Sequence, residues 1–138
     1  MRILVAVDGS KPSLKAVQLL IDHADWYRER PEAELVAVHR PVPKVAHLNK
    51  AQVEKYYSDE GEAMLAPAKK KLGAAGLAYQ ARVLVGPVAE TIVKHAKDKR
   101  CDIIYIGTRG MSELGAALVG STATKVLHIS ETPVLLVK

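Results

Sequence analysis

The sequence predicts a single α/β domain in which five parallel strands form one doubly wound sheet with helices on both faces, a three-layer sandwich. Apolar runs of strand length alternate with segments of helical periodicity along the chain, and this alternation is typical of parallel strands joined by right-handed crossovers. Two of the runs, residues 2–7 and 102–106, are apolar over nearly their whole length, as expected for strands that are buried on both faces. A chain of 138 residues has room for one domain, residues 1–138.

The first third of the chain predicts a strand, a helix and a second strand. Residues 2–7 form the first strand. Apolar residues then recur at helical spacing, and Ser10 or Ser13 can serve as the N-cap of that helix. Residues 35–38 form the second strand, which stops before two nearby prolines because proline continues neither a helix nor a sheet.

The rest of the chain continues the alternation. Residues 49–72 predict a long polar helix that Pro67 should kink or split. The later strands are expected at residues 79–85, 102–106 and 134–137, and the later helices at residues 88–96 and 122–129. The last strand is apolar on both faces and is expected at an edge of the sheet.

Composition indicates a folded protein of the reducing cytoplasm. Hydrophobic residues make up 49% of the chain and charged residues 25%, which is ordinary for a globular domain. The single cysteine, Cys101, excludes an intramolecular disulfide and a cysteine-based metal cluster. No apolar run reaches the length of a membrane span, so we expect no membrane contact.

The net charge of +5 favours ligands that carry phosphate. The only basic run, residues 69–71, falls on a predicted helix, and such a run is usually a solvated face. We therefore expect small phosphate ligands rather than nucleic acid as partners.

A candidate phosphate site follows the fourth strand, at the edge of the sheet where such folds bind ligands. Glycines let the backbone approach a ligand closely, and the N-terminus of the last helix favours anions. Ser121 and Thr122 add hydroxyl groups, and Arg109 adds charge at the rim. The segment is neither a Walker A loop nor the dinucleotide fingerprint. Its residues are Gly107, Thr108, Arg109, Gly110 and, after nine more residues, Gly120, Ser121 and Thr122.

This spacing resembles the signature of the universal stress proteins, in the branch that binds ATP. The opening Ile-Leu-Val-Ala-Val-Asp-Gly-Ser and the ending Thr-Pro-Val-Leu-Leu-Val agree with that family as well, so the resemblance covers essentially the whole chain. It implies the adenine nucleotide alpha hydrolase-like fold, which is Rossmann-like, and an adenine nucleotide as ligand: ATP, ADP or AMP.

The resemblance also implies roles for individual residues. The glycines and the serine of the signature would hold the phosphates and ribose: Gly107, Gly110, Gly120 and Ser121. Asp8 would contact the nucleoside, Ala6 and Val7 would lie near the ring, and Thr108 would line the same cleft. A homodimer through the C-terminal strand is implied too.

One position departs from the family. Where the second strand ends, the family often has His-Val, whose valine pairs its backbone with adenine, and this chain has His39-Arg40. Arg40 could stack on the base or obstruct it, and we retain it as a candidate binding residue.

Asp8 has a second interpretation. An aspartate before Gly-Ser is a good turn residue, although its place after a strand favours ligand contact. Asp8 could also help to hold Mg²⁺ shared with phosphate oxygens. The five histidines have no metal-binding spacing, and the sequence predicts neither a metal site nor a catalytic residue.

Three functions remain open. The first is a regulatory or stress-response protein that binds ATP with at most slow hydrolysis. The second is a genuine ATPase, for which the sequence offers no evident lysine or general base at the phosphate. The third is an interaction module for protein or nucleic acid that uses the glycine segment only as a turn.

Overall fold

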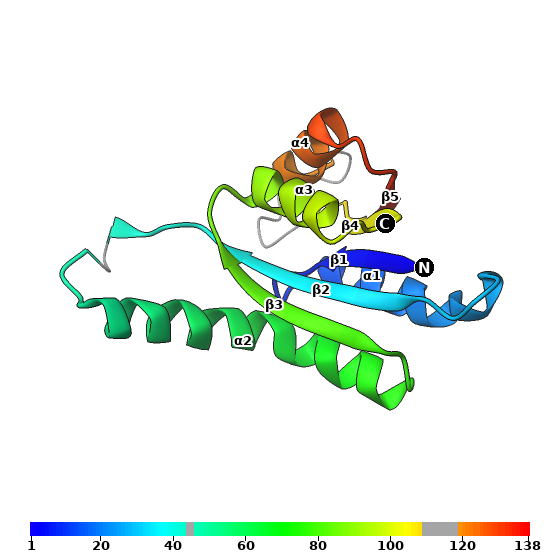
Figure 1. Ribbon diagram of the computed structural model, residues 1–138, viewed down its shortest axis with the longest axis horizontal. Coiled ribbons are helices and arrows are strands. Elements are labelled where there is room, and N and C mark those ends of the chain that lie inside the picture. Colours follow the sequence, from blue (N-terminus) through cyan, green and yellow to red (C-terminus); the bar gives the residue numbers. More distant parts are fainter. Residues whose placement is uncertain (44–45, 109–118) are drawn as a thin grey trace.

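The computed structural model describes residues 1–43, 46–108 and 119–138, and these have the predicted α/β fold. Strands and helices alternate in Figure 1. Within the described residues, five parallel strands pair in the order β3-β2-β1-β4-β5. The elements are β1 Arg2–Ala6, α1 Lys11–Asp22, η1 Ala24–Trp26, β2 Glu32–His39, α2 Lys50–Ala74, β3 Tyr79–Val85, α3 Val88–Asp98, β4 Ile103–Gly107, α4 Ser121–Ile129 and β5 Val134–Val137.

The strand order makes the chain reverse its direction across the sheet beside β1. From β1 the chain proceeds to β2 and β3, and then returns to β4 on the other side of β1. Connections leave the two halves of such a sheet toward opposite faces, so a crevice opens at the carboxyl ends of β1 and β4. The topology therefore fixes where a ligand can enter.

Two apolar cores lie on opposite faces of the sheet, because side chains alternate along each strand. On one face, Ile3 and Val5 pack with residues of α1 and α2 such as Leu20 and Leu65. On the other face, Leu4 and its neighbours pack against α3 and α4. The structure is thus the expected three-layer sandwich, with the layers separated in Figure 1.

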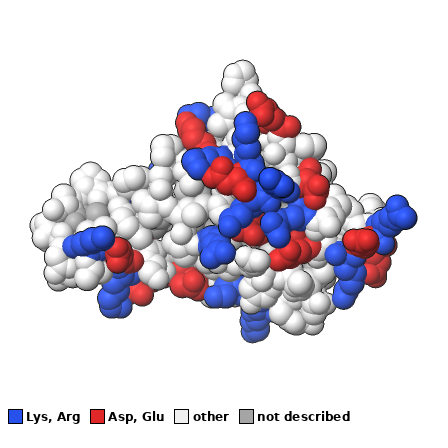
Figure 2. Space-filling model, in the orientation of Figure 1, with Lys and Arg blue, Asp and Glu red and all other residues white. Residues whose placement is uncertain are grey.

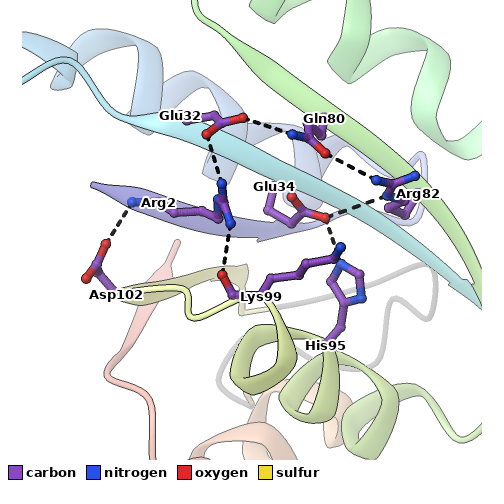
Figure 3. A network of polar contacts seen from close by, with 8 residues as sticks. All are labelled: Arg2, Glu32, Glu34, Gln80, Arg82, His95, Lys99 and Asp102. Carbon is purple, nitrogen blue, oxygen red and sulfur yellow. Dashed lines mark hydrogen bonds and ion pairs between the residues drawn. The ribbon is translucent and has the colours of Figure 1, made fainter.

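Strand β2 is longer than the sequence predicts, because it begins at Glu32 rather than at residue 35. Glu34 lies in the middle of the sheet and is only 1% exposed. Its carboxylate accepts a hydrogen bond from Nε2 of His95 on α3 (2.8 Å), and Arg82 Nε of β3 lies 4.0 Å from the same oxygen. Figure 3 shows the side chains of His95 and Arg82 converging on Glu34. Because its charge is paired, Glu34 can be buried inside β2, at a position before the predicted start of that strand.

Helix α2 runs through Pro67 without interruption, so the expectation of a split helix was wrong. A capping box begins it: the Gln52 N–H donates to Asn49 Oδ1 (2.9 Å), and the Asn49 N–H donates to Gln52 Oε1 (3.0 Å). Buried residues three or four positions apart hold the helix to the sheet on both sides of Pro67: Tyr57, Gly61, Leu65, Ala68 and Leu72. This packing outweighs the hydrogen bond that a proline cannot donate.

Helix α2 is also longer than the strand that it covers. Its 25 residues span about 38 Å, whereas the seven residues of β3 span about 23 Å. The amino end of α2 consequently projects beyond the strands, at the left of Figure 1.

Strand β5 occupies an edge of the sheet, as predicted, and pairs only with β4. Val134, Leu135 and Leu136 are half-buried. Among the described helices, none has the length and apolar character needed to cross a membrane.

Candidate functional site

A cavity of about 340 Å³ lies at the carboxyl ends of β1, β2 and β4, beneath α3 and α4. This size falls within the range of small-molecule sites. The cavity brings together all of the predicted site residues except Arg109 and Gly110, which lie outside the described residues. It is lined by Ala6, Val7, Asp8, Ser13, Val36, Val38, Arg40, Val88, Ile92, Ile106, Gly107, Thr108, Gly120, Ser121, Thr122 and Ala123.

Asp8 both forms the turn after β1 and lines the cavity. Its Oδ1 accepts hydrogen bonds from the Ser10 N–H (2.9 Å) and the Ser10 hydroxyl (2.5 Å). Gly9, at φ 81°, occupies the left-handed conformation that this turn requires. Oδ2 makes no hydrogen bond within the described part of the chain, so the two interpretations of Asp8 are compatible.

The N-terminus of α4 opens into the cavity without a side-chain cap. Gly120 is the N-cap residue, and neither a capping side chain nor an acidic residue lies in the first turn. The Gly120 N–H donates to the Thr108 carbonyl, which ties the helix start to the end of β4. The N–H groups of the first helical turn lack partners within the helix, and with the helix dipole they favour an anion beside Ser121 and Thr122.

Gly107 has a structural reason that the sequence did not reveal. A Cβ placed on this residue would lie 2.7 Å from the carbonyl oxygen and 3.0 Å from the carbonyl carbon of Pro12 on α1. The glycine therefore allows β4 to approach the start of α1, in addition to its place in the cavity wall.

The chain after β2 is held by side chains on both sides of Arg40. His39 Nδ1–H donates to the Arg40 carbonyl (2.7 Å), and the Val42 N–H donates to the Tyr57 hydroxyl (3.1 Å). The rings of His39 and Tyr57 also meet edge to face, with centroids 5.1 Å apart. Arg40 thus follows Val36 and Val38 on the same face of the strand and reaches the cavity.

An ion pair joins α3 to α4 near the cavity. The Lys125 ammonium pairs with the Glu90 carboxylate and holds the pKa of that carboxyl below its ordinary value, with further help from a backbone N–H. The charge of Arg40 acts in the same direction, which indicates that Arg40 and Glu90 share this rim.

Sequence reasoning missed the apolar wall of the cavity. Val36 and Val38 come from β2, and Val88 and Ile92 come from α3. The two valines continue the alternation that ends at Arg40, and Val88 and Ile92 belong to the helical stripe already recognised. A search for side chains on the same face of the second strand as Arg40 could have found the two valines.

Outside the cavity, Cys101 is a buried free cysteine. Burial raises the pKa of the Cys101 thiol to about 11, so this cysteine stays protonated near neutral pH and is a poor nucleophile. No cluster of three or more metal-ligating side chains occurs in residues 1–43, 46–108 and 119–138.

Comparisons with known proteins show which family and which solved structures this chain resembles. The Universal stress protein family matches residues 1–138. Universal stress protein YxiE of Bacillus subtilis (strain 168) is 32% identical over 149 aligned residues, which cover 99% of this chain and 98% of that protein. The solved structure of MJ0577, a protein of Methanocaldococcus jannaschii, matches with a TM-score of 0.83 at 28% identity and covers 99% of this chain and 94% of that chain. A universal stress protein solved in complex with cAMP matches with a TM-score of 0.74 at 26% identity, over 100% of this chain and 97% of that one.

Proposed function

Since this chain belongs to the universal stress protein family, we propose that it binds an adenine nucleotide, ATP or its di- or monophosphate, as a regulatory protein of a stress response. The observation that carries the proposal is the uncapped N-terminus of α4, which opens into a cavity of nucleotide size. The similar universal stress protein in complex with cAMP supports an adenine base as part of the ligand.

The proposed ligand lies along the row of strand ends. Ser121, Thr122 and the first-turn N–H groups of α4 would hold the phosphates, with Gly107, Thr108 and Gly120 beside them. Arg109 and Gly110 are proposed to complete this loop. The ribose would lie over β1, where Oδ2 of Asp8 can accept a hydrogen bond from a sugar hydroxyl or share Mg²⁺ with the phosphates.

Hydrolysis is proposed to be slow at most. Among the described residues that line the cavity, Asp8 is the only carboxylate and there is no lysine. One oxygen of Asp8 already accepts two hydrogen bonds from Ser10. Fast phosphoryl transfer normally needs charge placed on the transferred group and a residue that orients the attacking water.

We also propose that the protein is cytoplasmic and forms a homodimer in which the β5 strands of two copies pair. This strand leaves the backbone of one edge without a partner among the residues that the structure describes, and pairing across a two-fold axis would cover it. The single cysteine is buried and free, which suits a reducing compartment. Basic and acidic side chains are interspersed on the face drawn in Figure 2, and we do not propose nucleic acid as a partner.

Mass spectrometry of the gently purified protein under native conditions tests the proposal. We expect a bound adenine nucleotide, or saturable heat of binding when ATP and Mg²⁺ are added in a calorimeter. Gly120→Val should weaken binding at least tenfold, because a branched side chain would crowd the helix N-terminus. Gly73→Val is the matched control, since it adds the same side chain on α2, where nothing lies within 4 Å of the new Cβ.

Two results would replace this proposal. A protein without bound nucleotide, and without heat on addition of millimolar ATP and Mg²⁺, would indicate an interaction module. Sustained phosphate release at enzyme-like rates that disappears in Asp8→Ala would indicate an ATPase.

A further inference from the structure

Arg40 places a positive charge at one end of the cavity, where the other wall residues are apolar. Its guanidinium makes no hydrogen bond or ion pair with any residue that the structure describes. The side chains around this end, Val38 on β2 and Val88 and Ile92 on α3, have no polar groups to offer it. Glu90, which shares this rim, is already paired with Lys125. The guanidinium is therefore available to a ligand.

The strand order places Arg40 at the base end of a bound nucleotide. The phosphate end lies at β4 and α4, and β2 is two strands away across β1. Strands in a sheet are about 4.8 Å apart, so Arg40 follows a strand end about 10 Å from the end of β4. A nucleoside that spans this distance has its ribose over β1, and the C6 edge of its purine, which is remote from the glycosidic bond, points toward β2.

The Arg40 side chain favours a ligand that accepts hydrogen bonds. His39 Nδ1–H already donates to the Arg40 carbonyl, which uses one of the two lone pairs of that oxygen. The Arg40 side chain itself has five N–H donors and no acceptor. The Arg40 side chain consequently presents donors rather than acceptors to the base.

We infer that Arg40 selects a purine with an oxygen at C6, so that guanine and hypoxanthine nucleotides bind at least as tightly as adenine nucleotides. The arginine fork matches the O6 and N7 acceptors of guanine, whereas adenine presents an amino group in place of O6. The inference rests on the proposed nucleotide site and concerns only the base that this site prefers.

Calorimetry with ATP, GTP and ITP, each with Mg²⁺, tests the inference. In the unmodified protein, GTP and ITP bind as tightly as ATP or more tightly. Arg40→Gln shifts the ratio of the GTP and ATP dissociation constants about tenfold toward ATP, because a glutamine amide matches N6 and N7 of adenine. The control is Arg28→Gln, which removes the same charge from an exposed position before the amino end of β2 and leaves the ratio unchanged.

Each of the remaining outcomes overturns the inference. A preference for ATP over GTP in the unmodified protein, or an unchanged ratio in Arg40→Gln, overturns the inference and leaves the proposed adenine site standing. ITP that binds more weakly than ATP while GTP binds tightly overturns it too, because the 2-amino group would then be the group that is recognised. If none of the three nucleotides binds, the inference and the proposed function both fail.

Discussion

At the scale of single residues, Gly107 allows β4 to approach α1 closely. We expect Gly107→Ala to lower the free energy of unfolding by about 1–3 kcal/mol, because the new methyl group meets the backbone of Pro12 at 2.7 Å and the helix must shift. Urea denaturation measures the change. Gly73→Ala is the control: its Cβ meets nothing within 4 Å, and alanine in a helix should stabilise the protein by about 0.5 kcal/mol. Equal stability of the two variants would contradict the close contact.

The buried pair of Glu34 and His95 should behave as a unit. We expect His95→Ala to cost about 2–4 kcal/mol, because it leaves a carboxylate that is 1% exposed without its closest donor. Replacing both residues with leucine should cost less than this single change, since an apolar pair leaves no unpaired charge. Chemical denaturation of the three proteins makes the comparison. A double variant less stable than His95→Ala would show that the pair stabilises the fold beyond satisfying its own charge.

The residues that the sequence did and did not predict differ in the range of their interactions. Asp8, Ser121 and Thr122 were predicted because a strand end and a helix start are local patterns. Glu34 was not predicted as buried, since its partner His95 is 61 positions away along the chain and no local pattern announces the contact. The second role of Gly107 likewise depends on a helix from another part of the sequence.

At the scale of elements, α2 combines a proline that weakens it with a glycine that it needs. Pro67 lacks a backbone donor inside the helix, so Pro67→Ala should raise the free energy of unfolding by about 1–3 kcal/mol. Gly61→Ala should lower it, although alanine favours helices, because its Cβ would lie 2.2 Å from Cγ1 of Val83 on β3. Thermal denaturation followed by circular dichroism measures both shifts. A loss of stability in Pro67→Ala would mean that the proline shapes the contact with the sheet.

The existence and order of the strands and α-helices followed from the sequence, whereas the early start of β2 and the continuity of α2 did not. Alternating apolar patterns report the core faces of strands and helices, and these patterns placed every strand correctly in order. The start of β2 at Glu32 and the continuity of α2 at Pro67 depend on tertiary packing. Propensity at a single position cannot anticipate contacts that outweigh it.

At the scale of the whole molecule, the open edge of β5 provides a test of the proposed dimer. The carbonyl of Pro133 accepts a hydrogen bond from Ile104 of β4, and the carbonyl of Val137 accepts one from Thr108, which follows β4. In a parallel ladder the backbone N–H and C=O groups of alternate residues point toward opposite neighbours. The N–H of Leu136 therefore points outward. We expect Leu136→Pro to remain folded and become monomeric, because proline removes an outward donor that only a partner strand would use.

Leu136→Ala separates the backbone from the side chain in this experiment. It keeps the N–H group, so it should remain a dimer or dissociate only at higher dilution. Sedimentation equilibrium gives the mass of each variant. An unmodified protein that sediments as a monomer, or Leu136→Pro that sediments as a dimer, excludes association through this edge.

The overhang of α2 gives the molecule a region that opens independently of the rest. Residues 50–56 carry no fully buried side chain, so amide protons in these turns should exchange with solvent by local fraying, at rates far above those of global unfolding. Tyr57 is the first buried residue of the helix and also holds the chain after β2 through Val42. Fraying that reaches Tyr57 therefore frees the segment that carries Arg40, and a bound nucleotide should slow deuterium uptake at this end of the helix while leaving the slow protons near Leu72 unaffected.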